Sequence, residues 1–384
     1  MRLVCGAVVA LVLATTGGCA DGRDPAGAAG SAAGTIRLGT LVPLTGRSSS
    51  SGEAMVSAAR MAVDEANARG GVLGRRIELV VGDDACDAGT AVTAAHAMVA
   101  QDVTVSVGGY CSSATVPTLK IFRAAGVPMV LAQSNSTDLL TPKYDSVFLV
   151  CGTVAAEADF AAGWMTRTGA RRLAVVHDGT SFPVTLAEAT VAAARASGTI
   201  GVAGEWEISQ GAPGYGRTAK AIIDGGADVV YYTGYYAEAR QLVVDLRARG
   251  YRGKVVVGDG ATDGPLLEGL SRAQTADLYG TAMLVPELMP ELATWSQRYR
   301  TAVGSPPGPS TVESYDAVTV ALDAIRRAGT TDRAAVRKAI AETDMTALSG
   351  PMSFNPDGTR TTPRFLLLHA TGTGFRVIPQ PAQG

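Results

Sequence analysis

Short apolar runs alternate along the chain with longer stretches whose apolar residues recur at helical spacing, and this alternation restricts the possible folds more than any other feature. The runs predict strands at 36–41, 77–81, 103–107, 128–131, 173–177, 201–206, 229–232 and 254–257. The stripes predict helices at 54–68, 89–101, 113–125, 154–168, 184–197, 218–224 and 237–249. Strands that are apolar on both faces, each followed by a helix, indicate parallel sheets covered on both sides by crossover helices.

The strand–helix series occurs twice, first over 36–131 and again over 154–257, and a Pro-rich segment at 305–309 then precedes two predicted helices at 312–328 and 331–343. A length of 384 residues corresponds to two or three domains. With 47% hydrophobic and 18% charged residues, the chain is able to bury large cores and is not disordered. The sequence therefore predicts an α/β protein with two doubly wound parallel-sheet lobes.

The charge and residue counts exclude several classes of function. Lys and Arg number 33 against 35 Asp and Glu, and this balance argues against a nucleic-acid partner, which requires a basic surplus. Three His and five Cys provide few ligands for a metal enzyme. No apolar run reaches the roughly 20 residues that a membrane helix needs. We expect no metal and no cofactor.

The N-terminus has the pattern of an export signal. Arg2 precedes an unbroken apolar or small stretch from Leu3 to Ala14, which as a helix is about 18 Å long and too short to cross a bilayer. Small residues precede Cys19, as in the site at which bacterial lipoproteins are acylated. We predict a signal peptide at 1–18, lipidation of Cys19 and a flexible tether at 19–34. The alternative is a secreted protein cleaved nearby and carrying no lipid.

Polar loops follow the predicted strands of the first series, where open α/β sheets bind their ligands. Two glycines and then Ser112 and Ser113 follow the strand at 103–107. A serine hydroxyl together with the N–H groups at a helix start favours an anion such as a carboxylate, although an ordinary helix cap explains the same residues. Ser134 and Ser136 lie in the loop after the next strand, which would either bind a polar ligand or face solvent.

Phe182, Tyr235 and Asp259 each lie in a loop that follows a strand of the second series. Asp259 stands between two glycines, so it is suited to pair with a cation in a cleft or to serve as a plain turn residue. His177 ends a strand and is the candidate base for an enzyme, with a structural role as the alternative. The segment 258–263 lacks the third glycine of a dinucleotide-binding fingerprint.

Three cysteines remain once Cys19 is assigned to lipid. An exported chain favours disulfides, and Cys86 and Cys111 both follow predicted strand ends of the first series. A bridge between them would brace the loop that carries Ser112. Cys151 would then be unpaired, which is unusual in an exported protein.

Six ordered motifs together resemble the branched-chain amino acid-binding proteins of ABC importers, which have the type I periplasmic binding fold. The motifs are PLTG at 43–46, DDACD at 83–87, CSSAT at 111–115, AVVHD at 174–178, VYYTGY at 230–235 and MSF at 352–354. The resemblance extends from residue 35 to the C-terminus. It implies two lobes joined by a three-strand hinge that close on the ligand.

The resemblance also implies where the chain crosses between the lobes. The crossovers are expected near Cys151, Leu284 and Leu348. Lobe 1 would then comprise 35–151 plus 285–347, and lobe 2 would comprise 152–284 plus 348–384.

By the same resemblance, Cys86 and Cys111 form a disulfide. Ser112, with Ser113 beside it, would bind the α-carboxylate of an amino acid, helped by the loop containing Ser134 and Ser136. The α-ammonium would meet Asp259, and Tyr235 would contribute from the second lobe.

Two departures from the family concern the pocket that receives the ligand side chain. The family often has an aromatic residue where this chain has Ser51, placed in the loop before the first helix, and a Tyr where it has Phe182. Both changes reshape the pocket. A branched-chain or related aliphatic amino acid is the expected ligand, and another amino acid or a small amide-like solute is compatible.

The function predicted from these features is that of a monomeric, non-enzymatic solute-binding lipoprotein that delivers an amino acid to the membrane subunits of an ABC permease. It would be anchored to the outer face of the cytoplasmic membrane through Cys19, or be periplasmic or secreted without lipid. One alternative is a ligand-sensing protein for a signalling partner. Another is an enzyme that uses His177 or Cys111.

Overall fold

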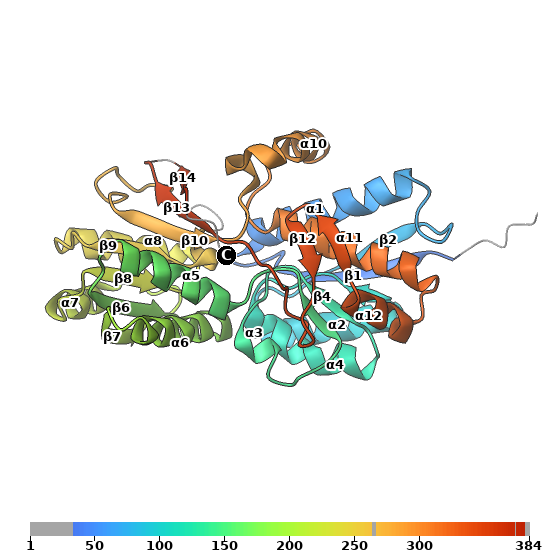
Figure 1. Ribbon diagram of the computed structural model, residues 1–384, viewed down its shortest axis with the longest axis horizontal. Helices are drawn as coiled ribbons and strands as arrows, with labels where there is room; N and C mark the ends of the chain where they lie inside the picture. Colours follow the sequence, from blue (N-terminus) through green and yellow to red (C-terminus); the bar gives the residue numbers. More distant parts are fainter. Residues whose placement is uncertain (1–33, 263–265, 373, 381–384) are drawn as a thin grey trace, which may run out of the picture. The chain divides into compact units, whose positions relative to one another are not determined.

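The computed structural model describes residues 34–262, 266–372 and 374–380, so the predicted signal peptide and Cys19 lie outside the described residues. The described residues belong to one compact unit. Within the described part, this unit contains a five-stranded sheet, a seven-stranded sheet and a two-stranded ribbon (Figure 1). The two larger sheets correspond to the two predicted strand series.

The first sheet has the strand order β2-β1-β3-β4-β5, and its pairs are parallel. Its strands are β1 (Ile36–Val42), β2 (Ile77–Asp83), β3 (Val105–Ser106), β4 (Met129–Leu131) and β5 (Val147–Leu149). One face carries α1 (Ser49–Ala68), α11 (Thr311–Ala328) and α12 (Arg333–Ala341). The other face carries α2 (Ala88–Ala100), α3 (Ser112–Thr115) and α4 (Leu119–Ala124).

The second sheet has the order β14-β13-β10-β9-β8-β6-β7. Its strands are β6 (Arg172–His177), β7 (Gly201–Glu207), β8 (Val229–Tyr232), β9 (Lys254–Val257), β10 (Leu278–Ala282), β13 (Leu366–Ala370) and β14 (Phe375–Ile378). α5 (Val154–Arg167) packs on α6 (Ser181–Ala196), and α7 (Gly216–Asp224) packs on α8 (Tyr236–Ala248). The predicted parallel sheet is confirmed in the run β10-β9-β8-β6-β7, and β13 and β14 extend it at one edge as antiparallel strands.

The predicted strand–helix series agrees with the structure to within a few residues at most boundaries. Two helices differ. α1 begins at Ser49 rather than 54, and the single helix predicted at 113–125 is divided into α3, a 3₁₀ turn (Val116–Thr118) and α4. Pro117 lies in that turn and lacks the N–H that a continuous α-helix would use.

The elements that the sequence did not predict lie mostly in the C-terminal third. They are β5, β10, α9 (Asp259–Thr262), α10 (Ala293–Val303), β11 (Asp344–Ala347), β12 (Gly350–Ser353), β13 and β14. The β11–β12 and β13–β14 pairs are antiparallel, so no helix follows their first strands and the strand–helix rhythm is absent.

The chain passes between the two sheets three times. It leaves the first sheet after β5, returns after β10 to place α11 against α1, and crosses again between β12 and β13. The residue limits of the two lobes given above stay a prediction.

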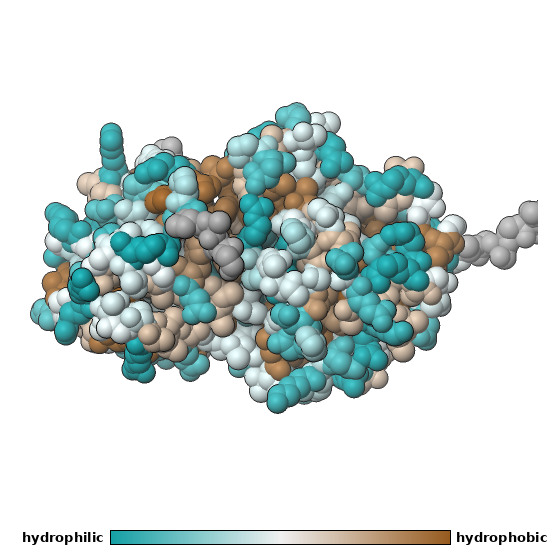
Figure 2. All heavy atoms as spheres, in the orientation of Figure 1, coloured by the Kyte–Doolittle hydropathy of each residue, from teal (hydrophilic) through white to brown (hydrophobic). Residues whose placement is uncertain are grey.

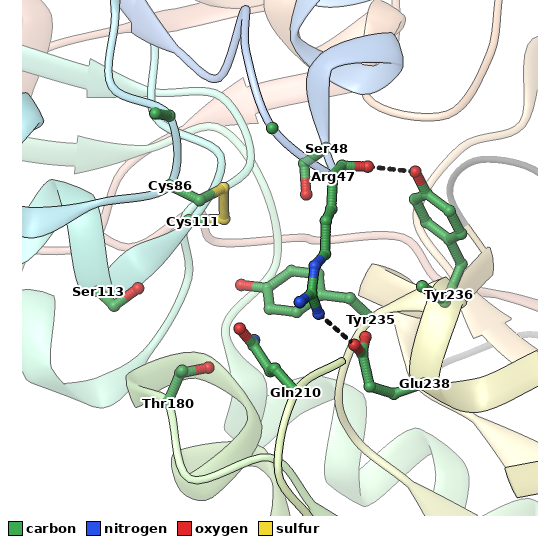
Figure 3. A pocket seen from close by; sticks show the side chains of 13 residues that line it. Arg47, Ser48, Cys86, Cys111, Ser113, Thr180, Gln210, Tyr235, Tyr236 and Glu238 are labelled. Atoms are coloured by element: carbon green, nitrogen blue, oxygen red, sulfur yellow. Dashed lines mark hydrogen bonds and ion pairs between the residues drawn. A yellow bond between two sulfur atoms is a disulfide. The ribbon is translucent and has the colours of Figure 1, made fainter. Parts of the chain in front are cut away.

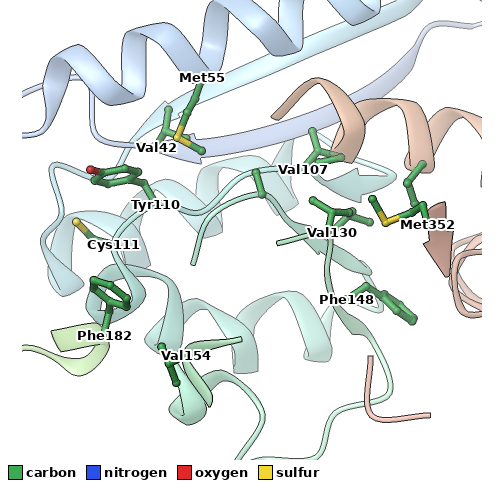
Figure 4. Close-up of a cluster of buried hydrophobic side chains, with 14 of the residues drawn as sticks. Val42, Met55, Val107, Tyr110, Cys111, Val130, Phe148, Val154, Phe182 and Met352 are labelled. Carbon is green, nitrogen blue, oxygen red and sulfur yellow. The ribbon is translucent and has the colours of Figure 1, made fainter. Parts of the chain in front are cut away.

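The core of the first sheet continues up to the loops at its carboxyl edge. Figure 4 shows Val42, Val107 and Val130 of this core, with Tyr110 and Phe182 at its margin. On the face seen in Figure 2, hydrophilic side chains predominate and hydrophobic atoms gather between α10 and the β13–β14 pair. Tyr110 and Phe182 are both buried, so the core fixes the position of the loops described next.

Candidate functional site

Loops that follow strands of the two sheets meet at hydrogen-bonding distance. Gln133 Nε2, after β4, donates to Asp259 Oδ2 at 3.3 Å, and Asn135 Nδ2 donates to the same oxygen at 3.5 Å. Asp259 begins α9 directly after β9 and is only 4% exposed. The carboxylate of one sheet is therefore held by the amides of the other, as expected for a site at strand carboxyl ends.

The predicted serines are joined to one another in this region. Ser112 Oγ accepts hydrogen bonds from the backbone N–H groups of Asn135 and Ser136, both at 3.3 Å. Ser134 Oγ lies 2.8 Å from Thr115 Oγ1. Ser112, Ser134 and Ser136 are fully buried, so the structure brings both predicted polar loops together.

The second sheet reaches the same loop through Ser181 at the start of α6. Its Oγ lies 2.9 Å from Ser136 Oγ and 2.7 Å from Asp138 Oδ2. The helix start that was expected to attract a carboxylate is short, since α3 has four residues and Cys111 caps it without a side-chain hydrogen bond. An anion here would be bound by hydroxyl and loop N–H groups rather than by a long helix dipole.

Glu157 lies behind Asp259 and was not identified from the sequence. This carboxyl group of α5 is fully buried, and its Oε1 accepts hydrogen bonds from Asp259 N at 2.9 Å and from Thr281 Oγ1 at 2.5 Å. Burial raises the pKa of Glu157, while hydrogen bonds from Thr281 and Asp259 oppose the rise. The signal in the sequence was a glutamate three residues after Val154, on the face of α5 that is otherwise apolar.

Three aromatic rings enclose the space beside Asp259. The ring centroids of Tyr110 and Tyr235 are 6.1 Å apart, and those of Phe182 and Tyr235 are 5.9 Å apart. These rings, with Gln133, Asn135, Asp259 and Gly260, line an inner cavity of about 10 Å³, room for about one water molecule. Burial, reinforced by the charges of Asp178 and Asp259, raises the pKa of Tyr235 well above its ordinary value, so its phenol stays neutral.

A larger outer cavity of about 290 Å³ lies on the other side of Tyr235, which lines both spaces. Figure 3 shows Arg47 extending across it toward Glu238, with Gln210 nearby. Arg47 Nη1 donates to Glu238 Oε1 at 2.7 Å, and Gly211 N donates to the same oxygen at 2.9 Å. The Tyr236 hydroxyl donates to the backbone carbonyl of Arg47, which makes a second contact between the two sheets' loops.

The Cys86–Cys111 bridge is present, with a Cα–Cα distance of 5.3 Å, and it lines the outer cavity together with Ser113. Cys151 is free, as predicted, and it is also buried, which raises the pKa of its thiol well above the ordinary value. Because Cys111 is bridged, its thiol is not available as a nucleophile.

Two of the sequence-predicted residues occupy other surroundings. Ser51 lies in the first turn of α1 rather than in the loop before it, and it lines neither cavity. Its hydroxyl is buried without a partner among the described residues. His177 Nε2 is 3.4 Å from Glu205 of β7, and its Nδ1 accepts from Gly179 N, so its ring is held between its own strand-end turn and the neighbouring strand.

The family model described as periplasmic binding protein matches residues 35–373. A Pseudomonas aeruginosa relative named amino acid binding protein is 29% identical over 306 residues, covering 78% of this chain and 80% of the relative. Leu/Ile/Val-binding protein homolog 3 of Brucella melitensis is 28% identical over 349 residues, covering 88% and 92%.

Solved structures have the same fold. A leucine-binding protein from Thermotoga maritima superposes with a TM-score of 0.81 at 24% identity, covering 90% of this chain and 98% of that one. A branched-chain amino acid transporter substrate-binding protein from Streptococcus pneumoniae, in complex with isoleucine, gives 0.78 at 21% identity and covers 90% and 99%.

Proposed function

The chain belongs to the periplasmic binding protein family, a non-enzymatic family of solute-binding proteins, and from this premise we propose that it captures a free α-amino acid between its two lobes for an ABC importer. The observation that carries this proposal is the meeting of Asp259 with the loop of Ser134 and Ser136 across the two sheets. Curated relatives named for leucine, isoleucine and valine binding support it.

Both charges of a zwitterion need partners, because an unpaired charge removed from water costs several kcal/mol. Asp259 would receive the α-ammonium group, which would replace the amide contacts that Gln133 and Asn135 now make. Ser112 Oγ and the N–H of Ser136 would receive the α-carboxylate in place of their mutual hydrogen bond. The neutral contact of Ser112 with Ser136 would thus be exchanged for charge-assisted ones, and the amide contacts of Asp259 for an ion pair.

Ligand binding would be coupled to closure because the two charge partners come from different lobes. A ligand that contacts both lobes stabilises only the arrangement in which they meet. The proposed lobes comprise 35–151 plus 285–347 and 152–284 plus 348–384, joined by a three-strand hinge. In this mechanism the amino acid is released when the permease separates the lobes.

The proposed setting is extracytoplasmic. Residues 1–18 would direct export, Cys19 would carry the lipid, and 19–34 would hold the monomeric binding unit away from the membrane. No helix in the described part of the chain has the length and apolar content to cross a bilayer. The resemblance favours a branched-chain or related aliphatic ligand.

The test is calorimetric titration of the full-length chain, purified in mild detergent, with each of the twenty amino acids. At least one should bind, and Asp259→Asn should weaken its affinity more than tenfold through loss of the ammonium partner. The control is Asp224→Asn, which alters an exposed i,i+4 pair with Lys220 and should leave binding unchanged. Absence of binding by every amino acid would refute the proposal.

A further inference from the structure

We propose that the outer cavity receives the side chain of the amino acid and selects a neutral, hydrogen-bonding one, for which a primary carboxamide is the best match. This inference rests on the proposed function, because it assigns the ligand's head group to Asp259 and Ser112. It replaces the aliphatic side chain that the family resemblance favours with a polar one.

The position of the outer cavity suits a ligand side chain. Tyr235 lines both cavities, and Ser113, adjacent to Ser112, lines the outer one. A side chain attached to a head group beside Ser112 would therefore pass the Tyr235 ring and enter the larger space. Its volume of about 290 Å³ is near the lower end of small-molecule sites.

Hydrogen-bonding side chains and small apolar ones together line this cavity. No Leu, Ile, Val, Met or Phe is among the described residues that line it. The described side chains that line it and carry hydrogen-bonding groups are Arg47, Ser48, Ser113, Thr180, Gln210, Tyr235, Tyr236 and Glu238. An aliphatic side chain would displace the water that hydrogen-bonds to these polar groups. Its methyl groups would offer no hydrogen bonds in exchange.

The Arg47–Glu238 pair determines which polar side chain fits. The side chain of Glu238 is 4% exposed, and its Oε1 takes the hydrogen bonds from both Arg47 and Gly211. In the described structure this leaves Oε2 of Glu238 as an acceptor and the remaining N–H groups of Arg47 as donors. The amide N–H of Gln210 donates to Asp178 at 2.8 Å, which leaves its oxygen as a further acceptor.

A carboxamide matches this arrangement because it donates and accepts at once. Its N–H₂ would donate to Glu238 and its oxygen would accept from Arg47. A carboxylate or ammonium at the end of the side chain would add a third charge to the Arg47–Glu238 pair, whose two charges already cancel, and would do so beside the buried side chain of Glu238. The cavity therefore disfavours glutamate and lysine as well as leucine.

The Arg47–Glu238 contact also joins the loops of the two sheets, so its loss would weaken closure around any ligand. Such a closing role would lower the affinity for glutamine and leucine by the same factor. Selection by the cavity would instead change the ratio of the two affinities. The ratio is thus the measurement that separates selectivity from closure.

The experiment measures the dissociation constants of L-glutamine, L-leucine, L-glutamate and L-lysine by calorimetry on the full-length chain and on its Arg47→Met variant. Glutamine should bind the unaltered chain at least about tenfold more tightly than the other three amino acids. This factor corresponds to one or two hydrogen bonds between its carboxamide and a charged side chain. Arg47→Met should reduce the ratio of the glutamine affinity to the leucine affinity by about tenfold. The matched control is Arg37→Met, which removes an exposed pair with Glu78 at 2.9 Å and should keep the ratio.

The inference is overturned if leucine binds the unaltered chain as tightly as glutamine, or if Arg47→Met weakens both equally. It is also overturned if glutamate or lysine binds best. Each of these results would leave the amino-acid-binding function in place. If none of the twenty amino acids binds, the proposed function fails as well.

Discussion

Glu313→Gln should remove a loss of stability that the protein suffers as the pH rises from 4.5 to about 7. Glu313 lies in α11 and is 3% exposed, and its Oε1 accepts a hydrogen bond from Leu284 N at 3.3 Å. Burial raises the pKa of its carboxyl from 4.5 to about 7, aided by the charge of Asp316 and opposed by Arg360. The group is therefore half protonated near pH 7 in the folded chain.

The same cluster holds the three passages of the chain between the sheets. Leu284 N is bound by Glu313 after β10. Asp316 accepts from the N–H groups of Leu348 and Ser349, at 2.8 and 2.9 Å, next to β12. Arg360 donates to the carbonyl of Val150, just after β5, at 3.1 Å, and to Ser349 Oγ at 2.8 Å. The titration of Glu313 thus takes place at the junction of the two sheets.

The sign of the effect follows from the raised pKa. Below pH 4 the carboxyl is protonated in both the folded and the unfolded chain. Between pH 4.5 and 7 it ionises only in the unfolded chain, so the free energy of unfolding falls as the pH rises. A difference between 4.5 and about 7, at ~1.4 kcal/mol per pKa unit, amounts to a loss of about 3 kcal/mol by pH 8.

Urea unfolding of the full-length chain at pH values from 4 to 8 measures this loss. The unaltered chain should lose about 3 kcal/mol more than Glu313→Gln over that range, because glutamine does not ionise and still accepts from Leu284. Glu342→Gln, at an exposed pair with Lys338, is the matched control and should follow the unaltered chain. Parallel pH profiles for the unaltered chain and Glu313→Gln would refute the reasoning.

Three other contacts predict measurable outcomes. Cys86→Ser opens a bridge that spans 25 residues and should cost about 3 kcal/mol of unfolding free energy by urea denaturation; an unchanged midpoint would contradict this. Gly52→Ala would place a Cβ 1.7 Å from Pro43 O, so the melting temperature should fall by several degrees. A fall no larger than that caused by Ser57→Ala, in the same helix, would argue against this close approach. Glu157→Gln should keep amino-acid affinity within about threefold, since an amide oxygen can accept the same hydrogen bonds from Asp259 N and Thr281 Oγ1, whereas a loss as large as that of Asp259→Asn would show that the side chain of Glu157 contributes to binding.

Local periodicity was sufficient to predict the elements that repeat the strand–helix unit. The bounds of β8 and β9 agree with the predicted strands to the residue. The first turn of α1 was missed because Ser49 to Gly52 have no apolar stripe. What fixes that turn is tertiary: Gly52 lies so close to Pro43 O that a larger residue has no room.

The sequence predicted candidate site residues only where a polar residue or polar loop directly follows a predicted strand. Asp259 follows a strand directly, and so do the loops that carry Ser112 and Ser136. Arg47 and Glu238 were missed because they are 191 residues apart and each looks like an ordinary surface charge in its own segment. Contacts of this kind depend on how the two sheets meet, and sequence periodicity contains no information about that.

The contacts across the two sheets' loops divide into those that a ligand would replace and those that it would leave intact. The amide contacts of Gln133 and Asn135 with Asp259 occupy the place proposed for the α-ammonium group. Ligand binding would break these contacts and form the ammonium contact, so the binding free energy would gain only the difference between the two. The contacts of Arg47 with Glu238 and of Ser181 with Ser136 lie outside that place. In the proposed mechanism both contacts would stabilise the closed arrangement, and the Arg47–Glu238 pair would in addition select the side chain that reaches the outer cavity. On this proposal the cleft would close partly through contacts of its own and would discriminate through the hydrogen-bonding groups of its outer part.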